Sequence, residues 1–206
     1  MRMLAWPILI AALPAVLHAQ APAAAAAAAA PLTEAQQIAS AVLPLPAEFR
    51  ADARGMGYRP SGKELVTLRS GGGAFTCLAS NPAQPRFHVA CYHRSLEPFM
   101  ARGRELRAKG ITKPEAVDSA RFAEIKSGKL KMPAAGALYS LSGKKANFNA
   151  ATNAVTGASQ LHVVYMPFAT TESTGLSDKM AQGSKAPFLM FPGTAKAHLM
   201  IIGSMQ

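Results

Sequence analysis

Acidic residues, aromatic residues and cysteines are all scarce in this chain of 206 residues. It has 11 Asp and Glu, 7% aromatic residues and two cysteines, against 22 Lys and Arg and 50% apolar residues. The large apolar fraction excludes a fully disordered chain, and the low cysteine content excludes a disulfide-dense miniprotein. The length suits one domain of ordinary size with its own hydrophobic core.

The sequence also lacks the motifs of common catalytic sites. It has no Gly-x-Ser-x-Gly nucleophile elbow and no His-Glu-x-x-His zinc motif. A glycosidase needs two facing carboxylates, and the sparse carboxylates here form no obvious pair. We therefore favour a non-enzymatic protein, and a hydrolase with an unidentified site is the third functional hypothesis.

The first nineteen residues predict a secretory signal peptide. Arg2 supplies the positive n-region, Leu4 to Leu17 form the apolar stretch, and Ala19 ends that stretch with a small residue. The apolar run is shorter than the roughly 20 residues of a membrane span, and two prolines interrupt it. We therefore expect a periplasmic or secreted protein without a transmembrane span in its mature form.

An Ala- and Pro-rich segment of low complexity covers residues 20–32 and is interpreted as a tether. A single domain is expected over residues 33–206. The spacing of Thr33 and Gln36 is typical of a capping box and predicts a first helix that stops at Pro44. Three β-compatible runs follow, separated by turn residues, at 64–69, 74–79 and 86–91.

Two further helices are predicted in the middle of the chain. One runs from Ser95, as its N-cap, to Lys109, and the next follows a capping-box spacing at Thr112 and Glu115 and ends near Lys126. Later strands are expected at 137–141, 161–168, 188–191 and 197–202. The order of these elements predicts an α+β fold. We expect a small antiparallel or mixed β-sheet with two or three helices packed on one side.

The two cysteines are predicted to form a disulfide. Side chains alternate along strands, so Cys77 and Cys91 are expected to point to the same face of neighbouring strands. In an oxidising compartment such a pair is oxidised by default. A redox-active or nucleophilic thiol is the alternative, but no Cys-x-x-Cys motif supports it.

The excess of positive charge indicates attraction to anionic envelope polymers or lipid headgroups, which would weaken with salt. Charge that only keeps the protein soluble is the simpler interpretation. Nucleic acid is disfavoured, because no stacking aromatics interleave with the cations and export removes the protein from nucleic acid. The leading hypothesis is a non-enzymatic envelope or extracellular binding protein with a cationic surface. Its densest cationic cluster is Arg94, Arg102, Arg104, Arg107, Lys109 and Lys113.

The second functional hypothesis is a copper site in the late strands. His162 and Met166 are four residues apart and His198 and Met200 two apart, so each pair shares a face of its strand. Imidazole and thioether ligands suit Cu(I), and Met190 could join them from the strand between. The alternative is that the methionines fill the core while the histidines form local hydrogen bonds or face water.

Two short motifs resemble a family of uncharacterised exported bacterial proteins. The first is the hairpin sequence from Gly73 to Cys77, and the second is the closing segment from Pro187 to Ile201. The family carries a similar Gly-aromatic-Thr-Cys hairpin and a Gly-Thr-Pro-x-x-His-x-Met segment, in which Ala195 here replaces the usual proline. The resemblance implies export and a similar fold organisation. It supplies no catalytic residue, but it draws attention to the turn and strand that lead to His198.

Overall fold

A computed structural model of the protein describes residues 31–60, 64–180 and 185–204. The chain divides between Ala30 and Pro31 into two units, and all described residues belong to the second. The expected signal peptide at 1–19 and the tether up to residue 30 therefore lie outside the described residues. Among the helices of the described part, none has the length and apolar character needed to cross a bilayer.

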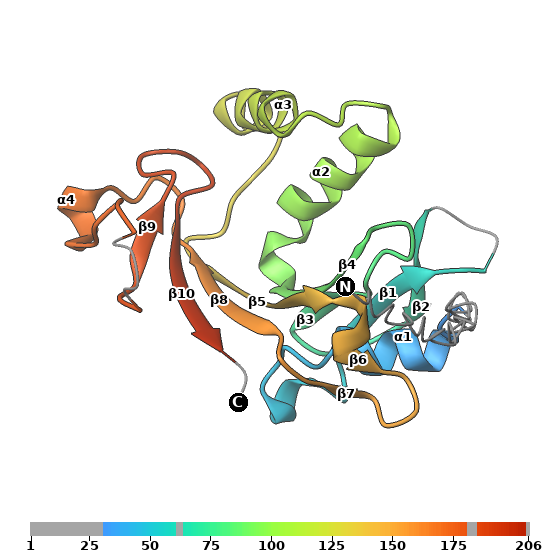
Figure 1. Ribbon diagram of the computed structural model, residues 1–206. Coiled ribbons are helices and arrows are strands. Elements are labelled where there is room, and N and C mark those ends of the chain that lie inside the picture. Colours follow the sequence, from blue (N-terminus) through green and yellow to red (C-terminus); the bar gives the residue numbers. More distant parts are fainter. Residues whose placement is uncertain (1–30, 61–63, 181–184, 205–206) are drawn as a thin grey trace, which may run out of the picture. The chain divides into compact units, whose positions relative to one another are not determined.

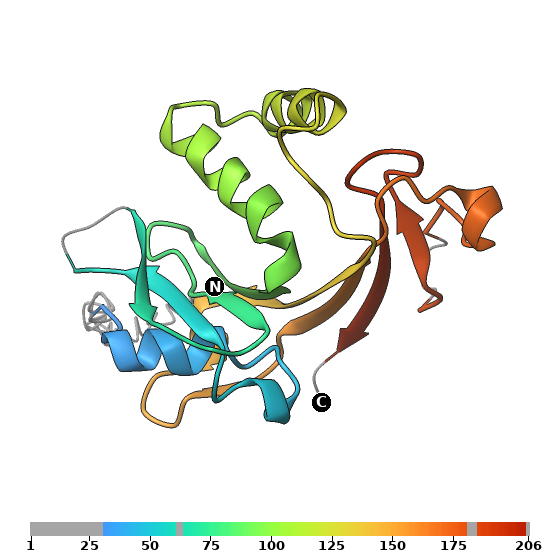
Figure 2. The same ribbon diagram turned by 180° about the vertical axis from the view of Figure 1, so that it is seen from behind.

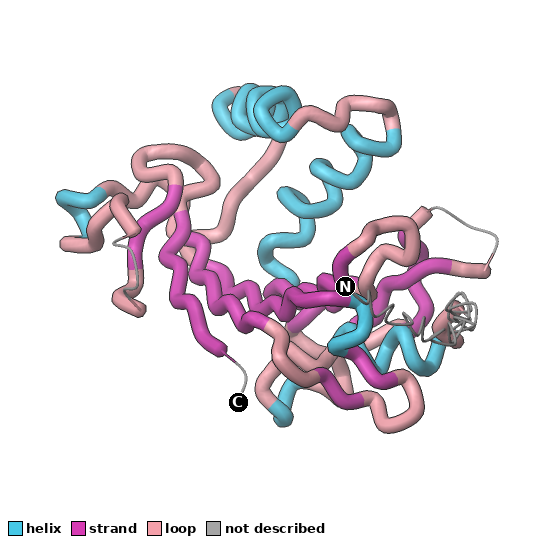
Figure 3. Tube along the Cα trace, viewed as in Figure 1, coloured by secondary structure: helices cyan, strands magenta, loops and turns pink. Residues whose placement is uncertain are grey.

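One mixed sheet dominates the fold. In the described part of the chain it has eight strands in the order β2-β1-β3-β4-β5-β8-β10-β9 (Figures 1 and 3). All neighbouring strands are antiparallel except β1 and β3. The α+β class is confirmed, but the sheet is larger than the small one expected. Strands β6 and β7 form a separate ribbon.

The helices and strands have the following bounds, where η marks a 3₁₀ helix. They are α1 (Glu34–Ala41), η1 (Ala47–Phe49), β1 (Arg54–Tyr58), β2 (Leu65–Arg69), β3 (Phe75–Leu78), β4 (Arg86–His93), η2 (Arg94–Leu96), α2 (Glu97–Ala108), α3 (Pro114–Lys126), β5 (Gly136–Lys144), η3 (Lys145–Asn147), β6 (Phe148–Asn149), β7 (Ala154–Val155), β8 (Ser159–Tyr165), α4 (Thr171–Thr174), β9 (Phe188–Met190) and β10 (His198–Ser204).

The predicted helices are present, but only one has the predicted cap. Thr33 forms the expected capping box, accepting a hydrogen bond from the backbone N–H of Gln36 at 3.2 Å. Helix α2 begins two residues after Ser95, which lies in η2 instead. Helix α3 begins after Lys113 without a side-chain cap, so the predicted box at Thr112 and Glu115 does not form.

Helices cover both faces of the sheet, as two consecutive residues of β4 demonstrate. The sulfur of Cys91 lies 3.1 Å from the Ala41 carbonyl oxygen of α1. The hydroxyl of Tyr92 donates to Glu97 of α2 at 2.6 Å. Because consecutive strand residues point to opposite faces, α1 and α2 lie on opposite sides of the sheet, as Figures 1 and 2 also show.

The expectation of helices on one side therefore holds only for α2 and α3, which are joined by a short turn, contact each other and together form the α2–α3 hairpin. We call the side of the sheet under this hairpin the hairpin face, and the opposite side the disulfide face. Both sides of β4 are covered near its end, where Cys91 and Tyr92 are both buried. A strand that is covered on both faces loses the alternation of apolar and polar residues that marks a strand covered on one face only.

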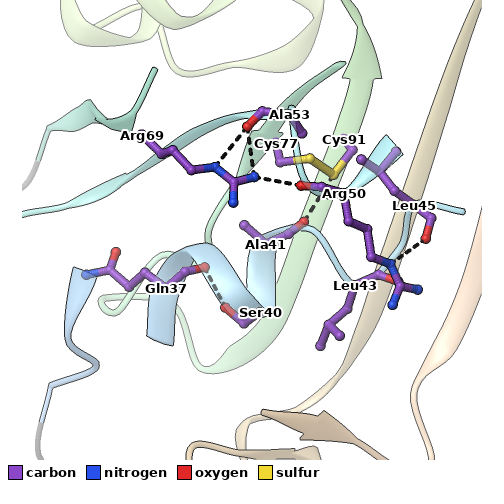
Figure 4. The surroundings of a disulfide bond; sticks show 10 residues. All are labelled: Gln37, Ser40, Ala41, Leu43, Leu45, Arg50, Ala53, Arg69, Cys77 and Cys91. Atoms are coloured by element: carbon purple, nitrogen blue, oxygen red, sulfur yellow. Dashed lines mark hydrogen bonds between the residues drawn. A yellow bond between two sulfur atoms is a disulfide. The ribbon is translucent and has the colours of Figure 1, made fainter. Parts of the chain in front are cut away.

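The predicted disulfide between Cys77 and Cys91 is confirmed. The two residues face each other across β3 and β4, and both are fully buried beside Ala41 of α1. Figure 4 shows two arginines around this core. Arg50 donates to backbone carbonyls of the segment after α1, and Arg69 donates to the carbonyls of Arg50 and Ala53. These guanidinium groups thus stabilise the loops that enclose the disulfide.

Candidate functional site

The four residues of the predicted copper site are not brought together. Strands β8 and β10 pair so that His198 lies opposite Tyr165, while His162 lies opposite Ile201. Directly paired residues share a face and consecutive residues alternate, so His162 points to the disulfide face and His198 to the hairpin face. When the pairing of two strands shifts by one residue, every side chain of the shifted strand moves to the other face of the sheet. The spacing of residues within one strand does not reveal how that strand pairs with its neighbour.

The two methionines of the predicted site are separated in the same way. Met200 shares the hairpin face with His198, two residues before it in the same strand. Met166 is the first residue after β8, four residues beyond His162. Its backbone N–H donates to the Ala197 carbonyl at 2.9 Å. The structure therefore places His162 on one face and His198 with Met200 on the other, with Met166 outside the strand, and the predicted cup of four ligands does not form.

His162 is packed as part of the sheet. Its ring lies edge-on to Tyr139 of β5, with centroids 5.3 Å apart. Its Nε2 atom is buried, and no atom of the described residues forms a hydrogen bond with it. This imidazole therefore lacks the polar surroundings expected of a ligand-binding side chain.

His198 has a more organised environment at the start of β10. Its Nδ1 lies 2.7 Å from the Lys196 carbonyl oxygen. A carbonyl only accepts hydrogen bonds, so Nδ1 carries the proton and Nε2 presents a lone pair. The rings of Tyr165 and Phe191 flank the imidazole, with centroids 5.1 and 5.7 Å away. Burial lowers the pKa of His198, which favours the neutral imidazole.

A largely buried ion cluster connects α3 to the turn before β10. The carboxylate of Asp118 accepts hydrogen bonds from Arg121 of the same helix and from Lys196 of the turn. Lys196 also lies 3.5 Å from the centre of the Phe191 ring, and Arg121 lies 3.7 Å from that of Phe99. Burial raises the pKa of Asp118, but the hydrogen bonds from the two cations outweigh it and hold that pKa below its ordinary value. The cluster fixes the turn whose Lys196 carbonyl orients His198.

The predicted cationic cluster on α2 is partly neutralised within the protein. Arg102 forms ion pairs with Glu105 and Glu124, and Arg104 forms one with Glu97. Arg94 donates to a backbone carbonyl. Arg107 donates to the Gly103 carbonyl of its own helix at 3.1 Å. Four of the six predicted cations are therefore engaged in internal contacts, although Arg107 keeps its charge unpaired by any carboxylate of the described residues.

A second group of cations has no carboxylate within ion-pair distance in the described part of the chain. All its members are exposed and belong to the α2–α3 hairpin or to the segment that follows it. We call this group the free-cation set, and it consists of Arg107, Lys109, Lys113, Lys126, Lys129 and Lys131. The last three were not singled out from the sequence, although they recur every two or three residues from the predicted end of the helix at Lys126.

An apolar hollow lies beside the last three cations. It is formed by the end of α3, the following segment and the loop after β8, and Ile125, Leu130, Pro167 and Phe168 contribute to its lining. Phe168 is 58% exposed and has a positive φ of 65°. A bulky residue in the left-handed region is uncommon. This loop therefore presents an aromatic ring to solvent next to Lys131, which also lines the hollow.

Within the described residues, no three His, Cys, Asp or Glu side chains are grouped so that they could hold a metal ion. Comparison with protein-family models, curated proteins and solved structures finds no match to this chain. The hypotheses below therefore depend on the chemistry of its own residues.

Proposed function

We propose that the protein is exported and binds, without catalysis, to the anionic lipid surface of the cell envelope through its α2–α3 hairpin. The observation that supports this proposal most directly is the free-cation set on the hairpin. A disulfide in the core is compatible with an oxidising compartment.

Four carboxylates near the free-cation set are already engaged by other cations. Glu97, Glu124 and Asp118 each contact at least one Arg or Lys side chain. Glu105 is bound by Arg102. The remaining lysines therefore keep their charge for an external anion. Each Lys or Arg near an anionic bilayer contributes about 1 kcal/mol of attraction.

The apolar groups beside these cations favour lipid over a soluble anionic polymer. Phe168 is exposed beside the hollow, and Ile111 is 37% exposed in the turn between α2 and α3, flanked by Lys109 and Lys113. Cations accompanied by exposed apolar side chains suit an interface with charged headgroups above an acyl layer. A polymer that offers only charge would gain nothing from Ile111 or Phe168.

Flotation with lipid vesicles tests this proposal. The variant Lys126→Gln/Lys129→Gln/Lys131→Gln removes three charges of the set. The matched control, Arg59→Gln/Lys179→Gln/Lys185→Gln, removes three exposed charges elsewhere. On vesicles of phosphatidylglycerol and phosphatidylcholine we expect the hairpin variant to bind roughly 100-fold more weakly than the unmodified protein. The control should retain most of the affinity.

Three outcomes would contradict the proposal. Equal losses in the two variants would show that only total charge matters. Binding that survives 1 M salt, where charges are screened within about 3 Å, would exclude the electrostatic mechanism. Binding to soluble polyphosphate without binding to vesicles would assign the hairpin to an anionic polymer instead.

A further inference from the structure

We propose that Met190, His198 and Met200 bind a single Cu(I) ion on the hairpin face, at the outer edge of the sheet. This thioether site differs from the four-residue cup predicted from the sequence, because Met190 takes the place of His162 and Met166. It does not depend on the lipid-binding proposal, since it uses none of the free-cation set.

The register of the last two strands brings the three residues together. Met190 of β9 is paired directly with His198 of β10. Met200 is two residues further along β10, so it points to the same face. Directly paired residues have Cβ atoms about 4.5–5.5 Å apart, and diagonal neighbours remain within reach of long side chains. Methionine, with three rotatable bonds, adapts readily to such spacing.

His198 is prepared for metal binding by the hydrogen bond of its other nitrogen. The Lys196 carbonyl accepts from Nδ1 at 2.7 Å, which leaves the Nε2 lone pair free. Histidine ligands commonly donate their second nitrogen to a carbonyl or carboxylate in this way, which fixes the tautomer and the ring. The Asp118 ion cluster in turn holds the Lys196 side chain. The ligand is thus oriented before any metal arrives.

The surroundings favour a soft, singly charged ion. Neutral thioether and imidazole ligands suit Cu(I), whereas carboxylates and water suit hard divalent ions. Met200 is paired with Phe188 and Val163, both buried. Two aromatic rings flank the imidazole of His198. All three ligands are half-buried, and β9 is the edge strand, so a small ion can reach them.

The test is an anaerobic titration with Cu(I) against the chelator bicinchoninate. Ascorbate keeps copper reduced without adding a thiol, and both cysteines are in the disulfide, so no free thiol of the protein competes. We expect one equivalent of Cu(I) to bind. The variants Met190→Leu and Met200→Leu keep apolar volume but remove a thioether, and each should weaken binding by about 10-fold or more.

Met166→Leu is the matched control, because it removes a thioether that lies outside β8 and is not paired with His198. It should leave the affinity unchanged. X-ray absorption of the copper complex should show sulfur and nitrogen neighbours, with less sulfur in each site variant. The absence of a one-to-one complex would overturn the proposal, and so would equal weakening by Met166→Leu. Circular dichroism confirms that each leucine variant remains folded.

Discussion

His162 and His198 lie on opposite faces of one sheet, although their strands β8 and β10 are neighbours. His162 packs against Tyr139, whereas His198 is held by the Lys196 carbonyl and lies between two aromatic rings. The same residue type therefore serves packing on one face and presents a free lone pair on the other.

This difference predicts opposite effects of the same substitution. His162→Phe should raise the free energy of unfolding by about 1 kcal/mol, because it removes a buried nitrogen that has no hydrogen-bond partner among the described residues and keeps a ring against Tyr139. His198→Phe should lower it by about 1 kcal/mol, because the hydrogen bond to Lys196 is lost. Urea unfolding of both variants measures the difference, and a loss of stability in His162→Phe would contradict our description of this face.

The ion cluster at Asp118 predicts a loss of stability on substitution. Asp118→Asn leaves Arg121 and Lys196 without their carboxylate, although their side chains are only 9% and 19% exposed. Removing one partner of a largely buried ion pair costs about 3 kcal/mol. Urea unfolding at pH 7 should show this loss, while Asp178→Asn, an exposed control, should change little.

The same cluster predicts how stability depends on pH. The pKa of Asp118 is lowered in the folded state, so its contribution is present above the pKa of the unfolded chain. That contribution disappears as the pH falls below about 4, through the folded value. The stability difference between the unmodified protein and Asp118→Asn should therefore shrink in acid. A difference that stays constant from pH 7 to pH 2 would show that folding leaves the pKa of Asp118 unchanged, and would contradict the role assigned to its two cationic partners.

Two adjacent glycines predict contrasting effects of alanine. A Cβ atom at Gly71 would lie 2.3 Å from the Asp52 carbonyl oxygen and 2.4 Å from the Arg54 nitrogen, whereas one at Gly72 would meet nothing within 4 Å. Gly71→Ala should destabilise the protein by about 1–3 kcal/mol, because backbone must move. Gly72→Ala should stay within about 0.5 kcal/mol of the unmodified protein. Thermal unfolding compares them, and equal effects would contradict the close approach of this loop to the segment before β1.

The disulfide predicts both a stability and a compartment. Cys77→Ala/Cys91→Ala should lower the free energy of unfolding by about 3 kcal/mol, as expected for a closed loop of this length. Alkylation of cells that carry the complete gene should label neither cysteine under native conditions, whereas expression without residues 1–19 in a reducing cytosol should leave both free. Free thiols in the complete protein in its own cell would contradict the proposed export.

Local elements were largely predictable from the sequence because their signals are local. The Thr33 capping box and the strands around Cys77 and Cys91 follow from short-range spacing and alternation, and the structure contains them. Strand β1 was missed because Gly55 and Gly57 dilute its pattern. Both glycines lie close to side chains of other elements, since a Cβ at Gly55 would lie 2.1 Å from the Ile38 side chain of α1 and one at Gly57 would lie 2.6 Å from the Leu68 side chain of β2.

The candidate sites depend on information that single strands do not carry. The copper prediction selected histidines and methionines correctly spaced within each strand, but the pairing of β8 with β10 separates them. Met190 was considered as an additional ligand from the sequence, but only its pairing with His198 places it beside that residue. Likewise, Arg102 counted as surface charge in the sequence, and only the fold brings Glu124 of α3 to it.

The register of β9, β10 and β8 is the central claim of this account, and methyl NMR tests it directly. In protein labelled at the methionine methyl groups, we predict nuclear Overhauser effects from the Met190 and Met200 methyls to the His198 ring. The Met166 methyl should show none to that ring. A strong effect between Met166 and His198, with none from Met190, would contradict the assigned faces and the thioether site with them.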